Sequence, residues 1–238
     1  MDWPFLIVAV IVFFAFFTQA ATGFGAGVIS LTLSALLFPI DVLLTWIVPL
    51  IALICSYLLI RHHDHIDWKL LLRVILPCMG GGMLVGQYFF YSLDGDLLKP
   101  ILGVVVIGLA LRELLRNADK QSRTPLLPWA LAGGVIHGMF ASGGPLLVYG
   151  LNAQPLDKAA FRSTLVVVWL VLALVLIASY IVSGKLTTAA LPNIGILAAI
   201  LPFSIIAGEK AHNHVPEATF KKAINVILIF CGVALLVR

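Results

Sequence analysis

Two short stretches of small residues carry the most distinctive backbone chemistry of this 238-residue chain. They read TGFGAG at residues 22–27 and FASGGP at residues 140–145, and each interrupts a long apolar run. Glycine permits conformations that end a helix, and proline favours the first turn of a new one, so each stretch predicts a helix that stops and restarts. The first N–H groups of a restarted helix have no carbonyl of their own helix to bind, and they lie at the positive end of its dipole. Such groups favour a negatively charged ligand.

Polar side chains near the breaks could add hydrogen-bond donors. Gln19 and Thr22 lie at the first break, His137 and Ser142 lie at the second, and Arg162 begins a later apolar run as a candidate recruiter of anions. An imidazole exchanges its proton near neutral pH, so His137 would also suit a proton-linked step. The predicted binding residues are Gln19, Thr22, Gly23, Phe24, Gly25, Gly27, His137, Ser142, Gly143, Gly144, Pro145 and Arg162.

Each of these features also has a purely structural interpretation. Glycines spaced four apart, as in the pairs 23/27, 82/86 and 134/138, are typical of closely packed membrane helices. A lone histidine such as His137 can be a packing or hydrogen-bonding residue. Arg162 can be an anchor whose charged head reaches the membrane surface. The sequence leaves these alternatives open for each single feature, and the matched pair of breaks favours a site.

The elements that carry these residues belong to a membrane protein. Hydrophobic residues make up 61% of the chain and charged residues 11%, whereas a soluble domain has roughly 25% charged residues. All eleven acidic residues fall in predicted loops or at predicted helix ends. Cation- and proton-coupled transporters usually keep an acidic residue within the membrane, so the sequence favours an anion as the transported solute.

Ten apolar runs predict an all-α integral membrane fold. A helix needs about 20 residues to cross the hydrocarbon core, a length that six of the runs meet and that the second and seventh do not. The runs are continuous rather than alternating, which excludes membrane strands. They fall at about 3–21, 26–38, 42–60, 70–92, 97–115, 125–140, 144–152, 159–182, 187–207 and 219–237.

The basic residues predict the orientation. Alternate connections between the runs hold twelve of the fifteen Lys and Arg residues, and the other side holds Lys99, Lys185 and Arg238. The positive-inside rule then places both termini on the extracytoplasmic side of a bacterial plasma membrane.

The runs divide into two halves of five elements that resemble each other. Gly25 corresponds to Gly143, the pair Pro39 and Asp41 corresponds to Pro155 and Asp157, and ILP at 75–77 corresponds to ILP at 200–202. Because five is odd, the second copy must lie upside down relative to the first, as in many secondary transporters. We therefore expect an inverted repeat, with the first unit at residues 1–118 and the second at residues 119–238, each with a broken or short helix at its start.

Other function classes have weaker support. The chain has no phosphate-binding loop and no recognisable pairing of a nucleophile with a base, so we expect neither an ATP-driven pump, an enzyme, a cofactor nor a nucleic-acid partner. The loop RHHDHID at 61–67 could bind a transition metal through His62, His63 and His65, but no second ligand cluster accompanies it. A passive anion channel would need the same breaks as a transporter and stays an alternative.

The motifs ATGFGAG, GGVIHGMFASGGPLLVYGL with FRSTL, and ILPFSIIAG resemble the TauE/SafE family of sulfite exporters and related permeases. The resemblance spans nearly the whole chain. It implies a bacterial plasma-membrane permease that moves a small sulfur-containing or carboxylate anion outward. It also implies that the pore-facing breaks are Gly23, Gly25, Gly27, Gly143, Gly144 and Pro145. The expected function is therefore secondary transport of a small anion by alternating access, with protons as the candidate coupling ion; oligomeric state is left open.

Overall fold

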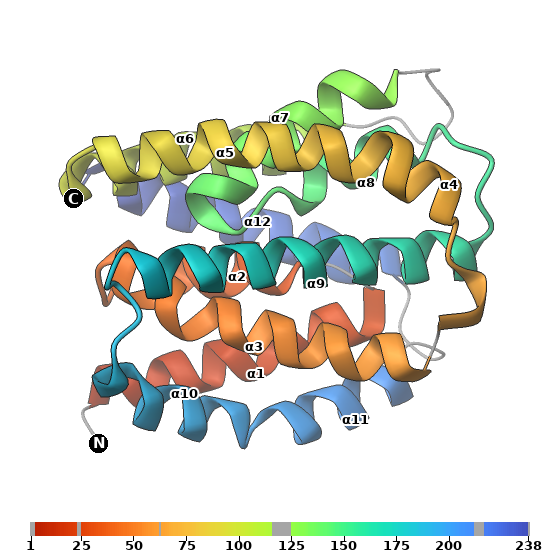
Figure 1. Cartoon of the computed structure of the whole chain (residues 1–238). Helices are drawn as coiled ribbons and strands as arrows, with labels where there is room; N and C mark the ends of the chain where they lie inside the picture. Colours follow the sequence, from red (N-terminus) through yellow and green to blue (C-terminus); the bar gives the residue numbers. More distant parts are fainter. Residues whose placement is uncertain (1–2, 23–24, 62, 116–124, 212–216, 238) are drawn as a thin grey trace.

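The protein is a bundle of roughly parallel and antiparallel helices, seen here in a computed structural model that describes residues 3–22, 25–61, 63–115, 125–211 and 217–237. No strand occurs in these ranges, which confirms the all-α prediction. Each expected apolar run has a helical counterpart (Figure 1). The main helices are α1 (Trp3–Thr22), α2 (Ala26–Ser34), α3 (Ile40–Arg61), α5 (Leu76–Ser92), α6 (Gly95–Leu114), α7 (Leu126–Phe140), α8 (Gly144–Leu151), α9 (Lys158–Val182), α10 (Leu191–Ala198), α11 (Leu201–Ala211) and α12 (Glu217–Val237).

Short turns extend two of these helices into longer rods. The turn α4 (Trp68–Leu70) and a wider turn at Leu71–Ile75 lead directly into α5, and a turn at Thr188–Ala190 leads into α10 and α11. Within the described residues, five helical stretches are long and apolar enough to cross a bilayer. They are Trp3–Ala21, Ile40–Arg61, Trp68–Ser92, Ala159–Val182 and Thr188–Lys210.

Acidic side chains lie where the sequence places them, at helix ends. The carboxylate of Asp157 accepts a hydrogen bond from the backbone N–H of Ala160 at 2.7 Å, and the carboxylate of Asp67 accepts one from Leu70 at 3.0 Å. Both are N-caps, which satisfy one of the N–H groups that a helix start leaves open. These two acidic residues therefore serve local helix starts, and in the described part of the chain the acidic residues lie at helix ends or in connections.

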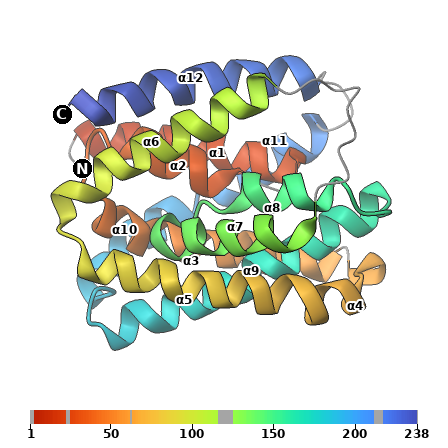
Figure 2. The same ribbon diagram turned by 90° about the horizontal axis from the view of Figure 1, so that it is seen from above.

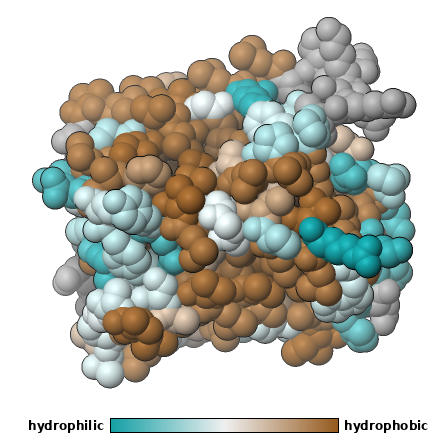
Figure 3. Space-filling view, turned by 45° about the horizontal axis from the view of Figure 1, so that its top comes forward, coloured by the Kyte–Doolittle hydropathy of each residue, from teal (hydrophilic) through white to brown (hydrophobic). Residues whose placement is uncertain are grey.

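The outside of the bundle has the polarity of a membrane protein. Apolar side chains cover the middle of the face in Figure 3, and hydrophilic ones gather toward the two ends of the helices. At one end Arg61 of α3 pairs with Glu209 of α11 at 3.5 Å. At the other end Lys185 approaches Asp41 at 3.7 Å, and α1 begins and α12 ends there (Figure 1).

Packing between helices follows a regular scheme. The helix α5 packs against α7, α1 against α11, α3 against α9, and α6 against α12, while α1 and α7 each pack against the short helix that follows them (Figure 2). Close contact between α5 and α7 depends on four glycines, because a Cβ added to any of them would lie 2.1–2.3 Å from a carbonyl oxygen of the other helix: Gly82, Gly86, Gly134 and Gly138. This confirms the packing interpretation of these two glycine pairs.

Candidate functional site

The first break separates α1 from α2. Helix α1 ends at Thr22, and α2 begins at Ala26 after Gly25, whose φ of 108° is a conformation that side chains with a Cβ rarely adopt. Gly25 therefore turns the chain sharply enough to start a second helix within the bundle. The predicted residues Gly23 and Phe24 lie outside the described residues, as does the side chain of Thr22.

The second break separates α7 from α8. Ala141 follows the last residue of α7 with a φ of 50°, and the hydroxyl of Ser142 donates a hydrogen bond to the carbonyl of Phe140 at 2.7 Å. Helix α8 then begins at Gly144, with Pro145 as its second residue. The proline occupies a position where its missing N–H removes no hydrogen bond from the helix.

The two breaks touch each other although they are more than a hundred residues apart in sequence. A Cβ added to Gly27 in α2 would lie 2.3 Å from the carbonyl oxygen of Ala141 in the second break. Glycine at position 27 therefore allows the first turn of α2 to lie directly against the chain reversal that follows α7. The segments that the sequence singles out in each half thus form one contiguous region.

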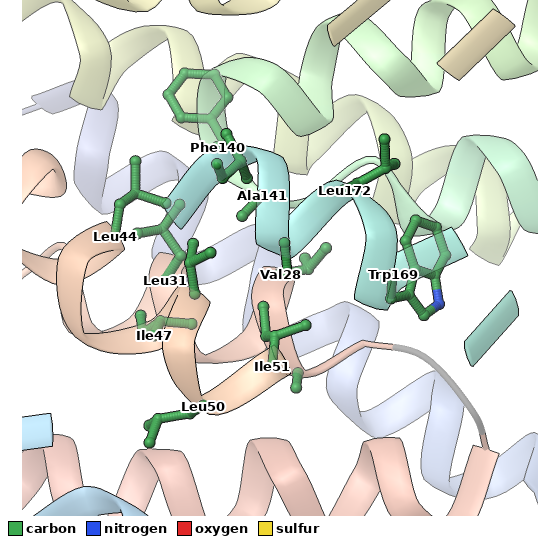
Figure 4. Packing of buried hydrophobic residues seen from close by; sticks show 14 of the residues in the cluster. Val28, Leu31, Leu44, Ile47, Leu50, Ile51, Phe140, Ala141, Trp169 and Leu172 are labelled. Atoms are coloured by element: carbon green, nitrogen blue, oxygen red, sulfur yellow. The ribbon is translucent and has the colours of Figure 1, made fainter. Parts of the chain in front are cut away.

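A small cavity lies where the breaks meet. Its volume of about 20 Å³ is enough for roughly one water molecule. All of its described lining residues except Gly25, which is partly exposed, are buried, so the cavity lies inside the bundle. Figure 4 labels four of its lining residues, namely Val28 on α2, Ile51 on α3, Ala141 in the second break and Trp169 on α9. The lining consists of Gln19, Gly25, Gly27, Val28, Ile51, His137, Ala141, Ser142, Gly144 and Trp169.

Gln19 joins the first break to its surroundings. Its side-chain oxygen accepts a hydrogen bond from the backbone N–H of Ala26 at 3.3 Å, and its side-chain nitrogen lies 3.5 Å from the sulfur of Cys55. The sequence predicts free N–H groups in the first turn of α2. At Ala26 this is wrong, because the Gln19 side chain of α1 accepts the hydrogen bond from that N–H group. Gly27 and Val28, the next residues of that first turn, line the cavity.

His137 is the titratable residue of the cavity lining that the structure describes. It is 2% exposed, and neither of its ring nitrogens has a hydrogen-bond partner in the described part of the chain. Its ring stacks on the indole of Trp169 with 5.6 Å between centroids and 20° between planes. Buried polar groups are normally paired, so an unpartnered imidazole beside a cavity marks a place where a ligand or water completes the hydrogen bonds.

Arg162 lies beside the first break and not in the cavity lining. Its guanidinium donates a hydrogen bond to the carbonyl of Ala20 in the last turn of α1 at 2.8 Å. A positive charge at the C-terminal end of a helix interacts favourably with the helix dipole. This contact ties α9 to the end of α1, immediately before the chain breaks.

Two other predicted residues lie behind the cavity. A Cβ on Gly143 would lie 1.9 Å from the carbonyl oxygen of Gly133, so Gly143 sits tightly against α7. Neither Gly143 nor Pro145 belongs to the lining, whereas Gly144 does. The second break therefore combines a packing glycine with a neighbouring glycine that faces the cavity.

Sequence reasoning missed four of the lining residues, namely Val28, Ile51, Ala141 and Trp169. Val28 and Ile51 are apolar residues within apolar runs, where nothing in the sequence distinguishes a cavity wall from ordinary packing, and Ala141 belongs to the second break but was not among the predicted residues. Trp169 carried a weak signal, since an indole N–H in the middle of an apolar run needs a hydrogen-bond partner.

An all-helical chain with several membrane-length helices and a cavity between two broken helices is a multi-pass membrane protein of the transport class. The family model described as "Sulfite exporter TauE/SafE" matches residues 8–235. The chain therefore belongs to the TauE/SafE family, which is a family of transporters and not of enzymes.

Two curated relatives agree with this assignment. The chain is 27% identical over 227 residues to the "Probable sulfite/organosulfonate exporter TauE" of Cupriavidus necator, covering 92% of this chain and 88% of that protein. It is 28% identical over 176 residues to the "Probable inner membrane transporter protein TsaS" of Comamonas testosteroni, covering 71% of this chain and 72% of that protein. No solved structure matches the chain.

Proposed function

We propose that this protein is a secondary transporter that exports a small anion, such as sulfite, an organosulfonate or a carboxylate, across a bacterial inner membrane. The observation that carries the proposal is the buried cavity between the two helix breaks, with the unpartnered His137 in its wall and no acidic residue in its described lining. The names of the two relatives, one a sulfite/organosulfonate exporter and the other an inner membrane transporter, support the solute class and the location.

The packing scheme supports an inverted repeat of units 1–118 and 119–238. In an inverted repeat, each helix of the first unit corresponds to one of the second: α1, α2, α3, α5 and α6 correspond to α7, α8, α9, α11 and α12. Under this correspondence the packed pair α5–α7 becomes the packed pair α11–α1, and α1–α2 becomes α7–α8. The pairs α3–α9 and α6–α12 are unchanged by the correspondence. A pseudo-two-fold relation between the units explains this pattern, and it brings both breaks to the middle of the bundle.

The size of the cavity favours alternating access over an open channel. About 20 Å³ holds roughly one water molecule, and sulfite has four heavy atoms. The solute can therefore bind only after the breaks move apart. Such a movement follows naturally if one inverted unit rocks against the other around the site.

The positive-inside rule orients the transporter. It places the end of the bundle that carries Arg61 in the cytoplasm and the end that carries Lys185 outside, with both termini extracytoplasmic. His137 is the candidate for a coupled proton, because its imidazole is the titratable side chain in the described cavity wall.

The test is flux through purified protein in liposomes. We expect saturable movement of labelled sulfite, faster when a pH difference is imposed, and loss of that acceleration in His137→Gln. Liposomes with Arg61→Gln, a change at the bundle end far from the cavity, are the matched control and should keep the pH response. Absence of sulfite, methanesulfonate and acetate flux above protein-free liposomes would refute the proposal. Currents that do not saturate would identify a passive channel instead.

A further inference from the structure

Trp169 of α9 is a buried hydrogen-bond donor in the cavity wall. Its side chain is 4% exposed, and its indole Nε1–H has no hydrogen-bond partner in the described part of the chain. An indole N–H can only donate a hydrogen bond, so a neighbouring donor cannot serve as its partner. A ligand acceptor in the cavity that Trp169 lines could therefore satisfy this group.

A second donor lies directly beside it. The rings of Trp169 and His137 are nearly parallel, with 20° between planes and 5.6 Å between centroids, and both line the cavity. Whichever tautomer a neutral His137 adopts, one ring nitrogen carries a hydrogen, and both nitrogens lack a partner among the described residues. Both rings line the same cavity and stack on each other, so a ligand in that cavity lies beside both of them.

Donors outnumber acceptors among the polar groups of the cavity lining. The side-chain oxygen of Gln19 accepts from Ala26, and the hydroxyl of Ser142 donates its hydrogen to the carbonyl of Phe140 while its oxygen can still accept. The first turn of α2 adds backbone N–H groups from Gly27 and Val28, for which that helix provides no acceptor. The polar groups of the cavity are therefore rich in donors, and water, which must also donate, satisfies them less well than a ligand that only accepts.

From this arrangement we infer that Trp169 and His137 form a paired donor clamp for an SO₃ group. Once the breaks have moved apart to admit the solute, the indole N–H binds one oxygen, the imidazole N–H binds a second, and the first turn of α2 binds the third. Three donor groups on three elements match the three oxygens of sulfite or of a sulfonate head group, whereas a carboxylate has only two. This inference rests on the proposed anion transport and assigns the residues that recognise the solute.

The test compares Trp169→Phe with wild type and with Trp46→Phe in the liposome assay. Phenylalanine keeps an aromatic ring against His137 and removes the N–H. Loss of one hydrogen bond to an anionic oxygen should raise KM for sulfite and methanesulfonate about 10- to 100-fold, with a smaller effect on acetate. Trp46 is a buried tryptophan of α3 that packs edge-on against Phe5 and Phe38, and it does not line the cavity. Its substitution should leave KM within about twofold of wild type, because no donor to the solute is lost.

The outcomes distinguish failure of the clamp from failure of the proposed function. Sulfite transport by wild type with an unchanged KM in Trp169→Phe would overturn the clamp and leave the proposed function standing, whereas inactive wild type would refute the proposed function itself. If Trp169→Phe does not fold, wild-type protein labelled with ¹⁵N-tryptophan replaces it. Sulfite should then shift the indole N–H resonance of Trp169, assigned by substituting the other four tryptophans one at a time. A resonance that does not move at saturating sulfite would overturn the clamp.

Discussion

Gly27→Ala tests whether the two breaks must touch for the protein to work. The added Cβ would lie 2.3 Å from the Ala141 carbonyl oxygen, and ordinary contact begins at 3.4 Å, so the breaks must separate by about 1.1 Å. Ala141 cannot easily give way, because its backbone N–H is bonded to the carbonyl of His137 at 2.8 Å and its φ of 50° is already unusual for a residue with a Cβ. The strain therefore falls on the contact between α2 and the second break.

The magnitude follows from two opposing contributions. Overpacking a tight contact costs about 1–3 kcal/mol, and replacing glycine by alanine within a helix returns up to about 1 kcal/mol. The net destabilisation is then about 1–2 kcal/mol, which lowers the thermal midpoint of a chain of this size by roughly 2–8 °C. If about 1.4 kcal/mol of this destabilisation affects only the solute-bound state, the apparent affinity for sulfite drops about tenfold.

The assay measures thermal unfolding in detergent and sulfite efflux from liposomes for the same preparations. Gly81→Ala is the matched control, because Gly81 lies exposed on α5 and an added Cβ meets no atom within 4 Å. We expect Gly27→Ala to have a lower thermal midpoint and a lower sulfite flux than wild type, and Gly81→Ala to match wild type in both. Wild-type midpoint and flux in Gly27→Ala would show that the breaks do not need this contact, and the two-break site would have to be abandoned.

Two further substitutions probe the surroundings of the cavity. Gly143→Ala places a Cβ 1.9 Å from the carbonyl oxygen of Gly133 and 2.9 Å from the Cβ of His137, so we expect a lower yield of folded protein than for Gly27→Ala, measured by size-exclusion chromatography; an equal or higher yield would contradict the observed packing. Arg162→Gln removes the charged donor to the Ala20 carbonyl, a type of bond worth about 1.5–3 kcal/mol, and should lower the thermal midpoint. An unchanged midpoint with a raised KM for sulfite would indicate anion recruitment in place of anchoring.

Local chain properties explain how well the helices could be predicted. A membrane helix satisfies its backbone hydrogen bonds within itself, so the length of an apolar run directly determines whether a spanning helix forms. The runs at 42–60 and 159–182 accordingly became α3 and α9, and the short run at 144–152 became the eight-residue helix α8. The breaks were predictable for the same reason, since Gly25 and Pro145 act on their own stretch of backbone.

What the sequence by itself determined is thus the set of helices, the places where they break and the position of the acidic residues in connections and at helix ends. Only the tertiary structure decided which groups share the cavity. It brought Gly27 against Ala141 and set Trp169 on His137 across long separations in sequence, and it used Gln19 to bind the backbone N–H of Ala26 seven residues later. A hydropathy pattern cannot distinguish the apolar side chains of a membrane helix, because an apolar side chain can face lipid, another helix or a cavity. Distance in space alone distinguishes a tryptophan that packs only against other helices, such as Trp46, from one that lines the cavity, such as Trp169.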